Sequence, residues 1–140
     1  MINEDAIIPT PQLSPASKAM PKVGAGLSCL VVLFLAFDGI TKVIRVAPVM
    51  EACQKMGISP DMAFSIGLLL LTCTIVYAIP RTAIFGAILL AGYLGGAAAT
   101  HVMQRSGVFP IAFAIGFGVL VWGGLVLREP QLVRWIFQRR

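Results

Sequence analysis

Three ionisable side chains lie within or at the edge of long apolar runs, and their types are suited to chemistry. Asp38 and Lys42 stand four residues apart in the stretch AFDGITKVIR, and His101 closes the stretch AGYLGGAAATH. A carboxylate, an ammonium group and an imidazole can together hydrogen-bond a polar head group or pass on a proton. Ionisable groups inside apolar segments are costly, so each of them indicates a functional site.

We therefore predict a head-group site formed by Asp38, Lys42 and His101, with a quinone as the cofactor class to consider. Two other interpretations stay open. In the structural one, Asp38 and Lys42 form a self-neutralising pair on one helical face, and His101 hydrogen-bonds a neighbouring helix. In the other, the three groups transfer protons. The sequence leaves open whether the protein is an enzyme.

Other kinds of chemistry find no support in the residue spacing. The only histidine is distant from Cys29, Cys53 and Cys73, and this is not the spacing of a zinc or haem site. No nucleophile–base pair and no glycine-rich phosphate loop is present. We predict no metal site, and apart from a quinone no cofactor is evident.

The composition is that of a membrane protein. Of 140 residues, 58% are hydrophobic and 12% are charged, whereas soluble domains carry about 25% charged residues. The net charge of +5 could suggest nucleic acid, but Lys and Arg lie at the edges of apolar runs rather than clustered on one polar face. The sequence therefore predicts contact with a lipid bilayer and no nucleic-acid binding.

Four segments are long and apolar enough to cross a bilayer, which takes about 20 residues: 24–45, 61–79, 82–104 and 108–127. They predict an all-α fold, a four-transmembrane-helix bundle. A short interfacial helix is expected after the first span, in PVMEACQKM, because Val49, Ala52, Cys53 and Met56 share one helical face.

The chain divides into a flexible cytoplasmic segment (1–23), the membrane domain (24–127) and a basic interfacial tail (128–140). Basic residues set the orientation, because they favour the cytoplasmic side. The two ends and the turn at 80–81 carry seven of them, whereas the opposite side carries four: Lys42, Arg45, Lys55 and Arg105. We predict a multi-pass inner-membrane protein with both termini in the cytoplasm.

The third span carries small residues in two parallel rows. Gly92 and Gly96 form one row, and Ala91, Gly95 and Ala99 form the other. Small residues let membrane helices approach closely. The rows predict packing inside the bundle, or alternatively a face for a homo- or hetero-oligomer.

Several motifs in a fixed order resemble the DoxX-like membrane proteins. The resemblance covers about residues 27–130 and rests on Gly39-Ile-Thr-Lys42, Pro48, Gly57-Ile-Ser-Pro60, Ile79-Pro80-Arg81-Thr82, the run Gly86-Ala-Ile-Leu-Leu, and Gly92-Tyr-Leu-Gly-Gly-Ala-Ala-Ala-Thr-His101. It implies a four-helix bundle in a bacterial inner membrane. It also implies an association with quinone-linked respiratory or thiosulfate-oxidising complexes, or with redox-stress assemblies.

The resemblance supplies the functional hypotheses. The principal one is an accessory or structural subunit of a membrane redox system, together with its partner subunit. The alternative is a quinone-binding oxidoreductase component with a polar site at the outer ends of spans one and three. The chain departs from the family at one position, because a glutamate often found three residues after Gly67 is replaced by Leu70. This puts any role of that carboxylate in doubt here.

Overall fold

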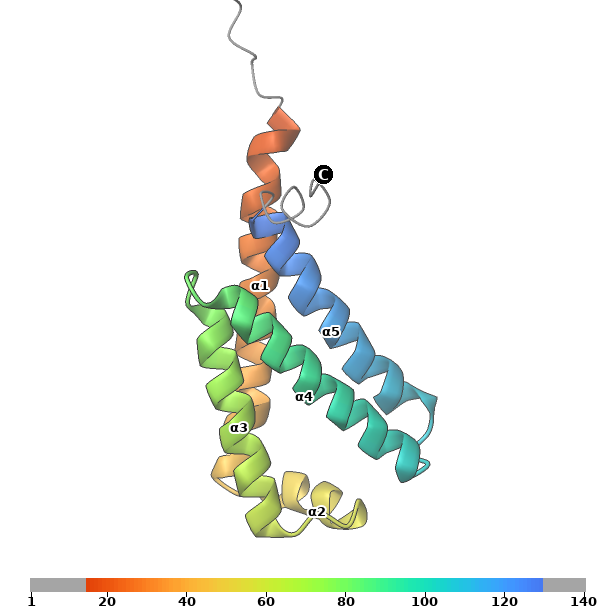
Figure 1. The fold of residues 1–140 in the computed structure, drawn as a ribbon. Helices are drawn as coiled ribbons and strands as arrows, with labels where there is room; N and C mark the ends of the chain where they lie inside the picture. Colours follow the sequence, from red (N-terminus) through yellow and green to blue (C-terminus); the bar gives the residue numbers. More distant parts are fainter. Residues whose placement is uncertain (1–14, 130–140) are drawn as a thin grey trace, which may run out of the picture.

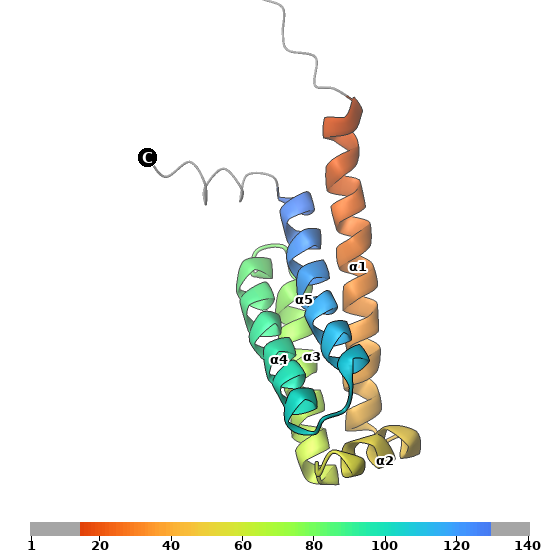
Figure 2. The same cartoon turned by 90° about the vertical axis from the view of Figure 1, so that its right-hand side faces the viewer.

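The computed structural model describes residues 15–129, and these form five helices. Four are long: α1 (Pro15–Val43), α3 (Pro60–Ala78), α4 (Ala83–Met103) and α5 (Val108–Arg128). The short helix α2 (Ala47–Lys55) follows α1 and lies across one end of the bundle (Figures 1 and 2). The predicted all-α bundle, with a short helix after the first span, is confirmed.

The outer surface of the four long helices is suited to lipid. Each is long and apolar enough to cross a membrane, with mean hydropathy between 1.7 and 2.1. Large apolar side chains face outward along them; Phe37, Phe85 and Leu33, for example, are 66–68% exposed. Exposed apolar surface on this scale is costly in water but not in a bilayer. The protein is therefore a multi-pass α-helical membrane protein.

Local signals in the sequence set the ends of α3. Ser59 caps its start by accepting a hydrogen bond from the Met62 amide at 3.3 Å, and Pro60 occupies the first helical position. The helix ends before Ile79, whose extended backbone is the conformation that the following Pro80 favours. The Thr82 hydroxyl then donates to the Val76 carbonyl at 2.8 Å. The resulting turn is short, so α3 and α4 are neighbours.

Helix α1 begins earlier than the apolar pattern predicted. Its first residue is Pro15 rather than one near Gly24, so residues 15–23 are helical, with Pro21 inside the helix. The predicted flexible segment therefore overlaps the start of α1. Its residues 1–14 lie outside the described residues, as does the predicted interfacial tail beyond Glu129.

Helix α2 packs on the bundle with a face that differs from the predicted one. Met50 and Cys53 are buried together with Ala63 of α3, and Val49 packs against them. Ala52, which was predicted to share a helical face with Val49 and Cys53, is exposed. Left-handed backbone conformations flank the helix, at Arg45 (φ 57°) and Gly57 (φ 72°). These two reversals fold α2 back under the bundle (Figure 2).

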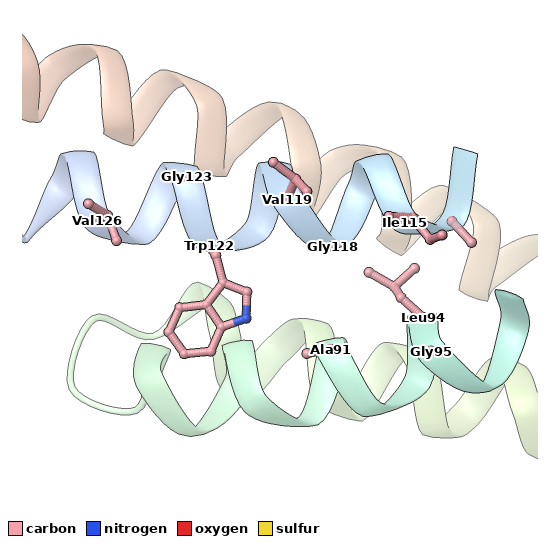
Figure 3. Close-up of a pocket in the computed structure, with 10 residues that line it drawn as sticks. Ala91, Leu94, Gly95, Ile115, Gly118, Val119, Trp122, Gly123 and Val126 are labelled. Atoms are coloured by element: carbon pink, nitrogen blue, oxygen red, sulfur yellow. The ribbon is translucent and has the colours of Figure 1, made fainter. Parts of the chain in front are cut away.

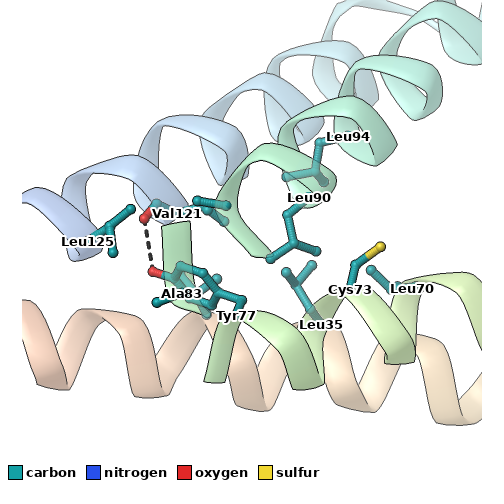
Figure 4. Packing of buried hydrophobic residues seen from close by; sticks show 11 residues of the cluster. Leu35, Leu70, Cys73, Tyr77, Ala83, Leu90, Leu94, Val121 and Leu125 are labelled. Carbon is teal, nitrogen blue, oxygen red and sulfur yellow. Dashed lines mark hydrogen bonds between the residues drawn. The ribbon is translucent and has the colours of Figure 1, made fainter. Parts of the chain in front are cut away.

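The start of α1 and the end of α5 lie at the same end of the bundle, here called the terminal end, and the helices pack most tightly there. Tyr77 is fully buried, and its hydroxyl donates to the Val121 carbonyl at 2.9 Å (Figure 4). Because that proton is used, Ser28 donates to the Tyr77 oxygen at 3.1 Å. A Cβ placed on Gly86 would collide with the Tyr77 backbone, so only glycine allows this approach of α4 to α3.

The helices separate towards the opposite end, here called the α2 end. Helices α1 and α3 stay together, because Gly67 faces Gly39; a Cβ on Gly67 would lie 2.9 Å from the Gly39 carbonyl oxygen. Helices α4 and α5 instead diverge from them (Figure 1). The bundle is therefore a wedge, closed at the terminal end and open at the α2 end.

This divergence overturns the predicted packing of the small residues of α4 inside the bundle. A Cβ on Gly92, Gly95 or Gly96 would meet no atom of residues 15–129 within 4 Å, and all three glycines are exposed. The face that α4 buries consists of Ala83, Gly86, Ala87, Leu90, Leu94 and Ala98. The close approach of α4 to its neighbours occurs earlier along the helix, at Gly86.

Candidate ligand cavity

A large cavity occupies the open half of the wedge. Its volume is about 840 Å³, and residues of all five helices line it, including Cys53 of α2. Ligand sites in proteins commonly measure about 300–1,000 Å³. The cavity is therefore large enough for a small molecule.

An ion pair forms part of its polar lining. Lys42 Nζ lies 2.5 Å from Asp38 Oδ1, and the two side chains are 16% and 37% exposed, respectively. The spacing of four residues on α1 brings the two groups together, as the sequence predicted. Asp38 lies about 7 Å from the end of α1, at 1.5 Å per residue. The pair neutralises two charges at a depth where either alone would be unfavourable.

His101 of α4 lines the same cavity. Its Nδ1 atom is buried and has no hydrogen-bond partner among the residues that the structure describes. Leaving a buried polar atom unpaired costs about 1–3 kcal/mol. The predicted hydrogen bond from this ring to a neighbouring helix is not made at Nδ1 within the described residues.

All three predicted site residues thus border one cavity, although they come from two helices. The structure adds polar neighbours from α4, Tyr93 and Thr100. The Thr100 hydroxyl donates to the Gly96 carbonyl at 2.9 Å, which leaves its oxygen free to accept. Tyr93, Thr100 and His101 recur at seven- and eight-residue spacing, a helical periodicity that could have identified them as one face.

Cys53 brings a thiol to the cavity from α2. Burial raises the pKa of this thiol, and the nearby Lys42 ammonium opposes the shift only in part. A raised pKa keeps the group protonated at neutral pH, so it behaves as a small neutral side chain and not as a nucleophile.

Phenylalanines form a wall of the cavity between α1 and α5. The Phe34 ring of α1 lies 4.5 Å from Phe117 and 5.6 Å from Phe113, centroid to centroid. Phe109 continues the row, 6.1 Å from Phe113. This wall was not predicted, although the spacing of four residues between 109, 113 and 117 indicates that the three rings share one helical face.

The cavity therefore has two chemical characters. Its polar part offers hydrogen-bond donors on Lys42 and His101 and a carboxylate on Asp38, whereas phenyl rings and aliphatic side chains make up much of the rest. Such a site suits an amphipathic molecule, one with a compact polar head and an apolar body.

A second hollow lies on the other side of α4, between α4 and α5. It measures about 580 Å³, and its lining consists of glycine, alanine, larger aliphatic residues and Trp122. The indole of Trp122 extends from α5 across this groove towards α4 (Figure 3). Because none of the described residues that line the groove has a titratable side chain, the groove is suited to contact with another apolar surface rather than to chemistry.

The fold and the cavity define a class, multi-pass helical membrane proteins with an internal site. The comparison with known families is more specific, because the model of the DoxX-like family matches residues 26–124. The chain belongs to the DoxX-like family. No curated protein and no solved structure matches it.

The structure also shows the surroundings of Leu70, the residue at which the chain departs from the family pattern. Leu70 has no exposed surface and belongs to the hydrophobic core, with Leu35 and Leu90 among its cluster. Leucine at this position stabilises the packing of α3 in place of a carboxylate.

Proposed function

We propose that this protein binds a quinone-type molecule in the cavity, as a component of a redox system in a bacterial inner membrane. One observation supports this most directly: His101, whose Nδ1 atom has no partner among the described residues, lines the same cavity as the Asp38–Lys42 pair. The carbonyl oxygens of a quinone can accept hydrogen bonds from the Lys42 ammonium and from the imidazole N–H of His101. Its flat ring suits a cavity lined by phenylalanines.

A second role is an accessory subunit that holds a redox complex together without binding the quinone itself. The two roles differ in what the isolated protein does. A binding component retains affinity for the head group when purified alone, whereas a purely structural subunit does not. Residues from all five described helices line the cavity, and this supports the first role.

Titration of the purified protein with a water-soluble, short-chain benzoquinone tests this proposal. We expect saturable binding that is weakened at least tenfold by His101→Leu or by the double variant Asp38→Leu/Lys42→Leu. Lys55→Met is the matched control, because Lys55 is an exposed basic residue of α2 outside the cavity. Absence of saturable binding, or equal affinity in all variants, would reject the site.

We also propose that a further membrane helix, from a second copy or a redox partner subunit, packs in the groove between α4 and α5. Ala91 and Gly95 line this groove opposite Gly118 and Gly123, and small residues permit close helix contact. Gly95→Leu fills the groove and should reduce the mass of the complex isolated in gentle detergent. An unchanged mass in this variant would contradict the association.

We also propose that the terminal end of the bundle lies at the cytoplasmic face of the membrane. Four membrane-spanning helices bring the start of α1 and the end of α5 to one side. The excess of basic residues on that side supports a cytoplasmic location.

A further inference from the structure

The two flanks of the cavity are built differently. Between α1 and α5, the Phe34 ring contacts those of Phe113 and Phe117 and bridges the two helices. Between α3 and α4, the helices diverge from their short turn towards the α2 end (Figure 1). The cavity lining on that flank includes Leu69 and Leu89, which are 54% and 48% exposed.

Gly92 and Gly96 of α4 also line the cavity, and both are exposed. A glycine inside a helix is less favourable than alanine by about 1 kcal/mol, so its presence needs a reason. At Gly86 the reason is the adjacent Tyr77 backbone, but at Gly92 and Gly96 an added Cβ would meet nothing within 4 Å. These two glycines leave space on the cavity side of α4 that a larger side chain would occupy.

The end of the cavity that faces the membrane surface is covered by α2. Cys53, Met56 and Ile58 line the cavity from this side. The Gln104 side chain donates to the Met56 carbonyl at 2.8 Å and so ties α2 to the turn after α4. An apolar chain bound in the cavity therefore meets protein at the α2 end and aromatic rings between α1 and α5.

From this arrangement we propose that the cavity opens sideways into the bilayer between α3 and α4, at a portal formed by Gly92 and Gly96. The ligand is a membrane-dissolved molecule with a long apolar chain, which passes through the portal into the lipid. This inference rests on the proposed function. It adds that the apolar chain of the ligand, which the head-group site does not hold, extends into the lipid.

Position along α4 supplies a matched set of variants. Gly92 and Gly96 line the cavity, whereas Gly95 lines the separate groove between α4 and α5. At all three an added Cβ would meet no described atom within 4 Å, so these substitutions meet no obstacle at the Cβ position. Gly92→Leu and Gly96→Leu fill the portal, and Gly95→Leu adds the same side chain on the other side of the helix.

The first experiment measures the affinity for two benzoquinones with the same head group, one with a methyl and one with a decyl substituent. In the unmodified protein we expect the decyl chain to raise affinity at least tenfold. Gly96→Leu should bring the ratio of the decyl to the methyl affinity close to one, whereas Gly95→Leu should leave this ratio unchanged. Retention of the full gain in Gly96→Leu, or the same loss in Gly95→Leu, overturns the portal.

A second experiment tests the portal without relying on a quinone. The protein is placed in bilayers that contain a phospholipid with a photoreactive group on its acyl chain, and crosslinked residues are identified by mass spectrometry. The portal predicts crosslinks at Leu35 and Tyr93, inside the cavity, and their loss in Gly96→Leu but not in Gly95→Leu. If the methyl benzoquinone does not bind but these crosslinks appear, the proposed function fails and the portal stands. Absence of crosslinks inside the cavity rejects the portal.

Discussion

The Tyr77 hydroxyl of α3 donates a hydrogen bond to the Val121 carbonyl of α5, across the closed end of the bundle. Tyr77 also lies beneath the Arg128 guanidinium, whose central carbon is 5.9 Å from the ring centroid. Ser28 of α1 bonds to the same hydroxyl oxygen, and Gly86 of α4 lies against the Tyr77 backbone. Tyr77 of α3 therefore contacts α1, α4 and α5 at the closed end of the bundle.

Tyr77→Phe should lower the free energy of unfolding by about 1–2 kcal/mol, because a buried hydrogen bond is lost and the Ser28 hydroxyl loses its acceptor. Thermal unfolding in detergent measures the change. Tyr93→Phe is the control, because the Tyr93 ring lies beside the cavity rather than in the closed end. An equal effect of the two variants would contradict the assigned role of Tyr77.

Gly86→Ala should destabilise the bundle by more than about 1 kcal/mol, because the new methyl group collides with the Tyr77 backbone, which cannot move aside cheaply. Gly95→Ala on the same helix meets no atom within 4 Å and should be neutral or slightly stabilising. Chemical denaturation of the two proteins in mixed micelles gives the comparison. The idea of a closed terminal end fails if Gly86→Ala is as stable as the unmodified protein.

Asp38→Leu and Lys42→Leu should each lower stability or abundance, because each leaves an unpaired charge near the membrane. Scales give about 2.5–3.5 kcal/mol for such a charge at a helix centre, and less nearer the interface. The double leucine variant should recover part of the loss, because no charge remains. Strictly additive losses in this cycle would show that the observed pair is not energetically coupled.

The orientation can be tested by labelling in intact cells. Single cysteines at positions 5 and 106 are introduced into a protein without its native cysteines. If the terminal end faces the cytoplasm, a membrane-impermeant maleimide should label Ser106→Cys but not Asp5→Cys. The reverse pattern would place the cavity's α2 end on the cytoplasmic side.

The parts of this molecule that depend on local sequence could be predicted well. The apolar runs gave spans at 61–79, 82–104 and 108–127, within a few residues of α3, α4 and α5, because length and hydropathy are properties of each segment alone. The Asp38–Lys42 pair was predictable for the same reason, since both residues lie on one helix. The extension of α1 to Pro15 was missed because its first residues are polar and proline-containing.

Contacts between helices were harder to predict. A glycine in a membrane helix leaves room for close approach, but the sequence does not say which neighbour approaches. Packing inside the bundle was predicted at Gly92 and Gly96, whereas the close approach occurs at Gly86. The acceptor for Tyr77 is a backbone carbonyl, which has no signature in the sequence. That His101 borders the same cavity as Asp38 depends on how far α4 diverges from α1, and this is set by packing at the other end.

The wedge shape has a consequence for the surrounding lipid. Because α4 and α5 splay away from α1 and α3, the molecule has a larger cross-section in the leaflet at its α2 end than in the opposite leaflet (Figure 1). If the helices move together at the α2 end, the cross-section of the protein decreases in that leaflet only. The lateral pressure of the lipids in that leaflet therefore acts on the width of the wedge. Lipids with small head groups and bulky chains exert their highest lateral pressure at the depth of the acyl chains. We expect such lipids, when present in that leaflet, to narrow the cavity.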